Sequence, residues 1–293
     1  MNSGFLYALG AYVVWGILPI YWKWLQHVPA GQIIGHRIAW SFILLLTFII
    51  TTRQWQKFRS ELKRRVLIIY SLAGCLLCVN WLVYVYGVNA GFIVETSLGY
   101  FINPLLSLVL GMVFLGERLR PAQWLPVGLA TCGVVYLTIT YGSQPWIALT
   151  LALTFGIYGL VKKIAPLGSL HGLTLETGFL FLPATIYLLF TDYSGQGAFG
   201  HDDLQTNMLL LGAGVVTIIP LLLFASAARR ITLTMVGIMQ YIAPSLQFLI
   251  GVFIYKEPFT RTKLIGFMMV WIALIIFWVE GVAARKKAKF APG

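Results

Sequence analysis

Long apolar segments alternate with short polar connections from one end of the chain to the other. An α-helix of about 20 residues spans the ~30 Å hydrocarbon layer of a membrane. The pattern therefore predicts ten transmembrane helices, with expected ranges 4–24, 31–51, 66–88, 96–115, 122–140, 146–163, 172–190, 207–227, 232–254 and 261–280. The first range is expected to be a span and not a cleaved signal peptide, because no basic region precedes it.

The composition agrees with a chain whose solvent is lipid. Hydrophobic residues make up 59% of the chain and charged residues only 10%, whereas soluble domains carry roughly 25% charged residues. The net charge of +12 does not indicate a nucleic-acid partner, because Lys and Arg are confined to short connections and the C-terminal tail. The lipid bilayer is the expected partner.

The positions of Lys and Arg predict the orientation, since these residues are retained on the cytoplasmic side during insertion. They concentrate after even-numbered spans, at Arg53, Lys57, Arg59, Lys63, Arg64, Arg65, Arg118, Arg120, Lys162, Lys163, Arg229, Arg230, Arg285, Lys286, Lys287 and Lys289. Lys23 and the cluster Lys256, Arg261 and Lys263 depart from this pattern. The sequence predicts a multi-pass protein with both termini in the cytoplasm.

The chain repeats itself at a spacing of 140 residues. The shift pairs Gly16 with Gly156, Lys23 with Lys163, Gly74 with Gly214, Pro104 with Pro244, Gly111 with Gly251 and Glu117 with Glu257. The expected domains are residues 1–141 and 142–293, each with five helices. Because five is odd, the second copy must cross the membrane in the opposite sense. Such inverted repeats are typical of secondary transporters, which bind substrate near the midplane between the halves. The predicted fold is all-α, with ten transmembrane helices in two inverted repeats.

Ionisable residues inside spans are costly and indicate functional sites. His36 and Arg37 lie about two turns into the second predicted span, and the shift places His36 on Glu176 of the second half. A His and a desolvated Glu are suitable proton carriers, so we interpret His36 and Glu176 as candidates for proton coupling. The alternative is a structural hydrogen bond to a neighbouring helix, and Arg37 is also a candidate for substrate binding.

Both halves carry a proline beside polar residues at mid-membrane. Tyr100, Asn103 and Pro104 lie in the fourth predicted span, and Gln240, Tyr241 and Pro244 lie at the matching positions of the ninth. A proline frees a backbone carbonyl one turn earlier, and broken helices bind ligands in transporters. These six residues are expected to line a cavity with helix breaks at the prolines; an ordinary packing kink is the alternative. Glu95, at the start of the fourth span, fits a favourable charge at a helix N-terminus.

Aromatic residues form 15% of the chain. Trp15, Trp81, Tyr84 and Tyr158 are spaced so that they can face one cavity, where flat rings suit an apolar or cationic solute. Asn80 adds a buried amide beside Trp81. Trp22 and other tryptophans near span ends are expected at the membrane interface, as are Lys162 and Lys163.

The chain shows no sign of enzyme chemistry. Cys75, Cys78 and Cys132 fall inside apolar runs, where small packing residues are expected, and no metal or cofactor site is predicted. No Walker-type, HExxH or GxSxG motif occurs, so no catalytic residue is proposed.

The segments GHRIAWS, FIVETSLGYFINPL, FGIYGLVKK, LTLET and GIMQYIAPS resemble the RarD group of EamA-type transporters, within the drug/metabolite transporter superfamily. The resemblance covers nearly the whole chain. It implies a bacterial inner-membrane exporter or facilitator of small metabolites, amino-acid-like compounds or drugs, with a cavity lined mainly by spans 1, 3, 4, 6, 8 and 9. It also implies peripheral fifth and tenth spans that contribute to a homodimer. The basic 256–263 connection departs from the family pattern.

The leading hypothesis is therefore a secondary transporter of a small molecule. A passive channel, a membrane scaffold and an intramembrane enzyme are the alternatives. Saturable counterflow in reconstituted vesicles distinguishes a carrier from a channel.

Overall fold

The computed structural model describes residues 3–89, 93–141, 145–256 and 261–290, and the regular elements within these ranges are all helices. The first half contains α1 (Ser3–Trp24), α2 (Ala30–Thr51), α3 (Trp55–Ser60), α4 (Arg64–Asn89), α5 (Ile93–Leu115), the 3-10 turn η1 (Pro121–Gln123) and α6 (Trp124–Tyr141). The second half contains α7 (Pro145–Ile164), α8 (Ser169–Tyr193), α9 (Leu204–Ala228), α10 (Leu233–Gln240), α11 (Ile242–Leu249), the π-helical turn η2 (Ile250–Ile254) and α12 (Arg261–Phe290).

The helices have the length and surface of membrane spans. In the described ranges, nine helical segments are long and apolar enough to cross a bilayer, and a shorter apolar stretch, Gly99–Leu115, lies in α5. Large apolar side chains such as those of Leu182 and Phe253 lie on the outside, where lipid and not water is the solvent. The predicted all-α membrane fold is confirmed.

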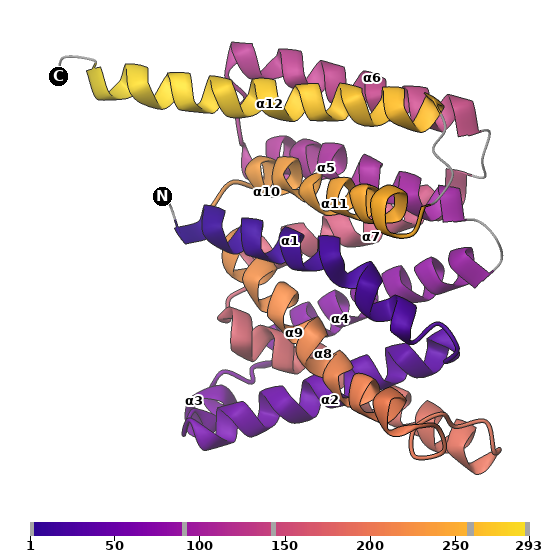
Figure 1. Cartoon of the computed structure of the whole chain (residues 1–293). Coiled ribbons are helices and arrows are strands. Elements are labelled where there is room, and N and C mark those ends of the chain that lie inside the picture. The colour runs from indigo at the N-terminus through magenta and orange to yellow at the C-terminus, as the bar shows by residue number, and fades with distance from the viewer. Residues whose placement is uncertain (1–2, 90–92, 142–144, 257–260, 291–293) are drawn as a thin grey trace.

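The helix bounds follow the 140-residue repeat. Helices α4 and α9 begin at residues 64 and 204, and α5 and α10 begin at residues 93 and 233. The packing follows it too: α1 packs on α9 as α7 packs on α4, and α5 packs on α7 as α11 packs on α1. Helices α6 and α12 pack on each other at one edge of the molecule (Figure 1). Helices of the first half thus pack against the second half in the same way as the equivalent helices of the second half pack against the first, as expected for two inverted repeats.

The repeated glycines lie where helices cross closely. A Cβ added to Gly16 would lie 2.7 Å from the side chain of Leu246, and one added to Gly156 would lie 2.8 Å from Leu106, which is the residue 140 positions before Leu246. Close helix contacts in membranes favour small residues. The glycines of the repeat therefore preserve the same helix crossing in both halves.

The start of α1, the short helix α3 and the end of α12 lie on one side of the molecule (Figure 1). We call this the terminal side. On the opposite side, Asp203 caps α9 by accepting a hydrogen bond from the Thr206 backbone N–H at 2.9 Å, and hydrogen bonding to Thr206 lowers the pKa of Asp203. Asp203 therefore places a negative charge at the N-terminus of α9, where it interacts favourably with the positive end of the helix dipole.

Two local features differ from the sequence predictions. The short helix α3 is not among the predicted elements. Helix α5 runs without interruption through Pro104, so a break at Pro104 is wrong. In the second half, the chain is interrupted at Tyr241, between α10 and α11, one turn before Pro244. Of the two predicted breaks, only the one before Pro244 is present. Pro244 has no N–H to donate to the backbone carbonyl four residues earlier, so the helix is interrupted there.

Candidate functional site

Arg37 points into the helix bundle and not toward lipid. Its Nε donates to Thr217 Oγ1 of α9 at 3.0 Å. Its guanidinium carbon lies 4.3 Å from the centre of a Trp81 ring in α4 and 4.9 Å from that of Trp22 in α1. Such distances are typical of cation–π contacts. Three helices besides α2 therefore hold this cation in the interior.

Two tyrosines complete what we call the Arg37 site, which consists of Trp22, Arg37, Trp81, Tyr84, Tyr100 and Thr217. Tyr84 and Tyr100 lie close enough to Arg37 to interact with it electrostatically, and their ring centres are 5.9 Å apart. Tyr84 is 39% exposed, and Arg37, Trp81 and Tyr100 are only partly buried. Tyr84 therefore contributes exposed surface beside the partly buried side chains of the site.

Arg37 has no counter-ion among the residues that the structure describes. The acidic residues with described side chains all have other partners: Glu61 pairs with His171, Glu117 with the α10 N-terminus, Glu176 with Lys162, Asp192 with His201, Asp202 with His27, Asp203 with Thr206 and Glu280 with Arg120. The side chains of Glu95 and Glu257 lie outside the described part of the chain.

Asn103 supplies an unsatisfied acceptor one helical turn from Tyr100. It is 1% exposed, and its Oδ1 has no hydrogen-bond partner among the described residues. On α5, Gly99 and Leu106 face α7, whereas Pro104 and Ser107 face α10. Asn103 lies between these two faces by helical periodicity, one turn after Tyr100. Asn103 therefore lies on the side of α5 that α7 and α10 enclose.

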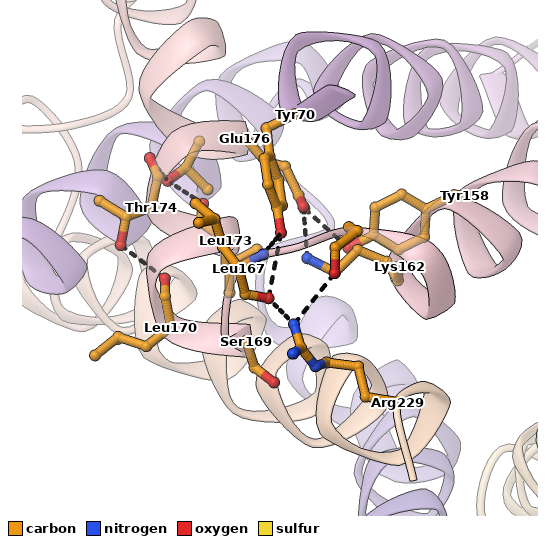
Figure 2. A network of polar contacts seen from close by, with 12 residues as sticks. Tyr70, Tyr158, Lys162, Leu167, Ser169, Leu170, Leu173, Thr174, Glu176 and Arg229 are labelled. Atoms are coloured by element: carbon orange, nitrogen blue, oxygen red, sulfur yellow. Dashed lines mark hydrogen bonds and ion pairs between the residues drawn. The ribbon is translucent and has the colours of Figure 1, made fainter. Parts of the chain in front are cut away.

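A second polar cluster lies close to the terminal side. Lys162 Nζ is 2.5 Å from Glu176 Oε1, and the side chains are 2% and 1% exposed. Tyr158 donates to Glu176 Oε2 at 3.0 Å, and the Tyr70 ring centre is 5.3 Å from Lys162 Nζ. Figure 2 shows these side chains meeting between α4, α7 and α8. Lys162 is thus buried and does not take the interfacial position that the sequence predicts.

The same cluster fixes the connection between α7 and α8. The Tyr70 hydroxyl accepts from the Leu167 N–H at 3.0 Å and donates to the Leu167 carbonyl at 3.3 Å. Arg229, at the end of α9, donates to the carbonyls of Leu167 and Ala165 (Figure 2). We call Tyr70, Tyr158, Lys162, Leu167, Glu176 and Arg229 the Lys162 network. It ties α4 and α9 to the hairpin of α7 and α8.

Two further ionic side chains fix the connection between α9 and α10. Lys163 Nζ donates to the carbonyls of Ala228 and Ile231 at 3.1 and 2.6 Å. Glu117 accepts from the backbone N–H groups of Leu233 and Thr234 at 2.6 and 2.8 Å. A cation at a helix C-terminus and an anion at the next N-terminus are both favourable.

An aromatic cluster fills the space between the Arg37 site and the terminal side. Trp15 lies 5.8 Å from Phe155 and 5.6 Å from Phe224, and Tyr158 is stacked on Phe224 at 5.9 Å. Tyr12 donates to the Val236 carbonyl, near the start of α10, at 2.9 Å. The terminal side is closed by packed side chains.

The structure separates the remaining candidates from the Arg37 site. His36 Nδ1 accepts from Trp40 Nε1 at 3.2 Å, and its ring centre is 5.1 Å from Phe199. Asn80 donates to the Leu151 carbonyl and to Thr154 Oγ1, both at 3.0 Å.

The candidates of the ninth predicted span occupy different surroundings. The Tyr241 hydroxyl donates to the Phe101 carbonyl at 3.3 Å. Pro104 and Tyr241 line an apolar pocket toward α6 and α12, away from Arg37. Gln240 is buried.

Several important residues were missed by sequence reasoning. Lys162 follows Tyr158 by one turn, so the pair lies on one helix face, and this spacing could have indicated a common partner. Thr217 carries no signal in the sequence, and the position of Trp22 near a span end indicates an interface anchor instead. The contacts of both residues with Arg37 depend on tertiary packing. No three His, Cys, Asp or Glu side chains come together as a metal site in the described ranges.

Comparison with known proteins gives a consistent picture. A model of the EamA-like transporter family matches residues 2–139 and 144–279. The chain is 44% identical to the "Uncharacterized transporter YojE" of Bacillus subtilis, over 98% of this chain and 97% of that protein. It is 43% identical to "Protein RarD" of Salmonella typhi, over 98% of both chains, and 28% identical to the "Chloramphenicol-sensitive protein RarD" of Pseudomonas aeruginosa, again over 98% of both.

A solved crystal structure has a similar fold. It superposes with a TM-score of 0.70 over 94% of this chain and 97% of its own, at 16% sequence identity. At that identity, the similarity supports the fold alone.

Proposed function

The chain belongs to the EamA-like transporter family and, within it, to the RarD group, and from this premise we propose that it exports small organic molecules across a bacterial inner membrane by alternating access. The family membership supports transport by a membrane protein. Export, the inner membrane and the alternating mechanism are the finer parts of the proposal.

The observation that supports the mechanism is the buried and hydrogen-bonded closure of the terminal side. The Lys162 network and the aromatic cluster close the terminal side, whereas the Arg37 site contains partly exposed side chains. Arg37 is seven residues from the α2 end opposite the terminal side, or about 10 Å at 1.5 Å per residue. We therefore infer that a solute would reach Arg37 from the opposite side.

The distribution of Lys and Arg favours the cytoplasm for the terminal side, so we infer that this state would be open to the outside. An inverted repeat can reach the opposite state when the two halves exchange conformations. In that state the Lys162 network would have to separate, so that the site becomes open to the cytoplasm. We thus propose that the Lys162 network is the cytoplasmic gate.

Solute exchange between two compartments tests the proposal. Cells with and without the gene are compared for excreted metabolites, and compounds that differ are loaded into vesicles containing the purified protein. A carrier gives saturable uptake and counterflow of labelled solute against excess unlabelled solute. Uptake without saturation or counterflow would indicate a channel and would contradict alternating access.

A further inference from the structure

We propose that the Arg37 site binds the carboxylate of a small organic acid with a flat, apolar body. The inference rests on the proposed function, because it names the class of molecule that would be transported. It depends on three observations about the described residues: an interior cation without a counter-ion among them, aromatic rings already engaged by that cation, and a buried acceptor without a partner among them.

The charge of Arg37 calls for an anion. An ionised side chain inside a membrane protein is costly unless it is paired, and such residues commonly contact substrates. Thr217 accepts only the Nε proton, and no carboxylate of the described residues neutralises the guanidinium. The two terminal nitrogens of a guanidinium match the two oxygens of a carboxylate in a bidentate pair.

The aromatic rings argue against a cationic solute. The guanidinium of Arg37 lies over Trp22 and Trp81, so the protein's own cation occupies the ring faces that would attract a positively charged ligand. A second cation beside it would be repelled. The expectation of an apolar or cationic solute is therefore replaced by that of an anion whose apolar body contacts the rings of Tyr84 and Tyr100.

The number of charges limits the anion further. One guanidinium compensates one negative charge, and a second charge in a low-dielectric interior would remain unpaired at high cost. This favours a monocarboxylate over a phosphate ester or a dicarboxylate. Asn103 Oδ1, buried and without a described partner, can accept a hydrogen bond from a donor group elsewhere on the same molecule.

Matched acids and amides test this inference without any need for transport. Binding of phenylacetate, phenylacetamide, indole-3-acetate and indole-3-acetamide to the purified full chain is measured by calorimetry and by the rise in melting temperature. We expect each acid to bind at least about tenfold more tightly than its amide, since hydrogen bonds to charged groups are the stronger ones. Equal affinities, or no binding of either member at millimolar concentration, would overturn the inference.

Variants show whether Arg37 causes the preference. Arg37→Gln is expected to abolish the difference between acid and amide, and Arg37→Lys to retain part of it. A purely structural role would lower the melting temperature of Arg37→Gln but leave the preference intact, which would overturn the inference. Arg59→Gln, which removes an exposed charge on α3, should leave both affinities within twofold of those of the original protein.

Glu95→Gln tests for a hidden counter-ion. If Glu95 neutralised Arg37, its removal would strengthen acid binding severalfold; we expect no such change. Counterflow in vesicles is measured separately. Acid-selective binding without counterflow would uphold this inference and contradict the proposed function. Counterflow of acids and amides at equal rates would uphold the proposed function and contradict this inference.

Discussion

Lys162 and Glu176 form an ion pair of 2.5 Å inside the bundle, from adjacent helices of the second repeat, with both side chains almost fully buried. Removing one partner of a buried pair leaves an uncompensated charge and typically costs about 3–5 kcal/mol, whereas replacing both partners by apolar groups is often neutral. The pair is therefore expected to contribute more to the choice of conformation than to net stability.

A double-mutant cycle tests this. We expect Lys162→Met alone to lower the melting temperature of the purified protein strongly, and Lys162→Met combined with Glu176→Leu to recover most of the loss. Lys57→Met, at an exposed lysine of α3, is the control and should have little effect. Additive losses in the double variant would show that the two charges are not coupled.

The rate at which a cysteine at position 173 is labelled measures how often the proposed cytoplasmic gate opens. Leu173 is 1% exposed within the core cluster near the terminal side, so a cysteine there should react slowly with a maleimide in a background without the native cysteines. Tyr70→Phe combined with Arg229→Gln removes the side-chain hydrogen bonds to the α7–α8 connection. We expect this pair of changes to accelerate labelling of Leu173→Cys at least about tenfold. Lowering the free energy of gate opening by about 1.4 kcal/mol raises the fraction of molecules with an open gate tenfold.

Ser60→Cys, at an exposed position of α3, controls for general reactivity and should be labelled rapidly in both backgrounds. If the labelling rate of Leu173→Cys does not change while the protein remains folded, the network does not act as the gate.

The spans and the repeat were predictable from the sequence, whereas the pairing inside the site was not. Lipid-length apolar runs identify helices because a backbone in hydrocarbon must satisfy its own hydrogen bonds. The matched Gly16 and Gly156 mark one helix crossing seen twice.

The partners of Arg37 had no such signal. Thr217 lies 180 residues away along the chain, and the position of Trp22 near a span end predicts an interface anchor. A sequence pattern records which face of a helix is apolar, but the contact of a long side chain depends on how the helices cross.

Gly237 tests the packing of the two central helices of the repeats. A Cβ at this position of α10 would lie 2.8 Å from the Pro104 carbonyl oxygen of α5, and backbone cannot move aside easily. We expect Gly237→Ala to destabilise the protein by about 1–3 kcal/mol, as overpacking does. Gly128→Ala, in α6 with no atom within 4 Å of an added Cβ, should be neutral or slightly stabilising. Equal melting temperatures for the two variants would contradict the close contact.

Asn80 is expected to act in packing and not in substrate binding. Its Nδ2 donates to the Leu151 carbonyl and Thr154 Oγ1 of α7. Asn80→Leu should therefore lower the melting temperature, with a loss of roughly 1–2 kcal/mol for the interhelical hydrogen bonds, and leave the preference for acids over amides unchanged. A loss of that preference at unchanged stability would return Asn80 to the binding site.

Proton coupling through Glu176 and His36 remains a prediction, and the structure suggests a sharper form of it. Glu176 is held by Lys162 and Tyr158 in the closed terminal side, so opening of the gate must separate a carboxylate from its cation, and protonation of Glu176 would lower that cost. His36 has only the neutral Trp40 as its described hydrogen-bond partner. If Glu176 carries the proton, a pH gradient across reconstituted vesicles should change the rate of solute uptake. Glu176→Gln combined with Lys162→Met, which leaves no uncompensated charge, should abolish this response while counterflow persists. His36→Ala should then retain the response. Uptake that is indifferent to the gradient in the original protein would exclude coupling at either residue.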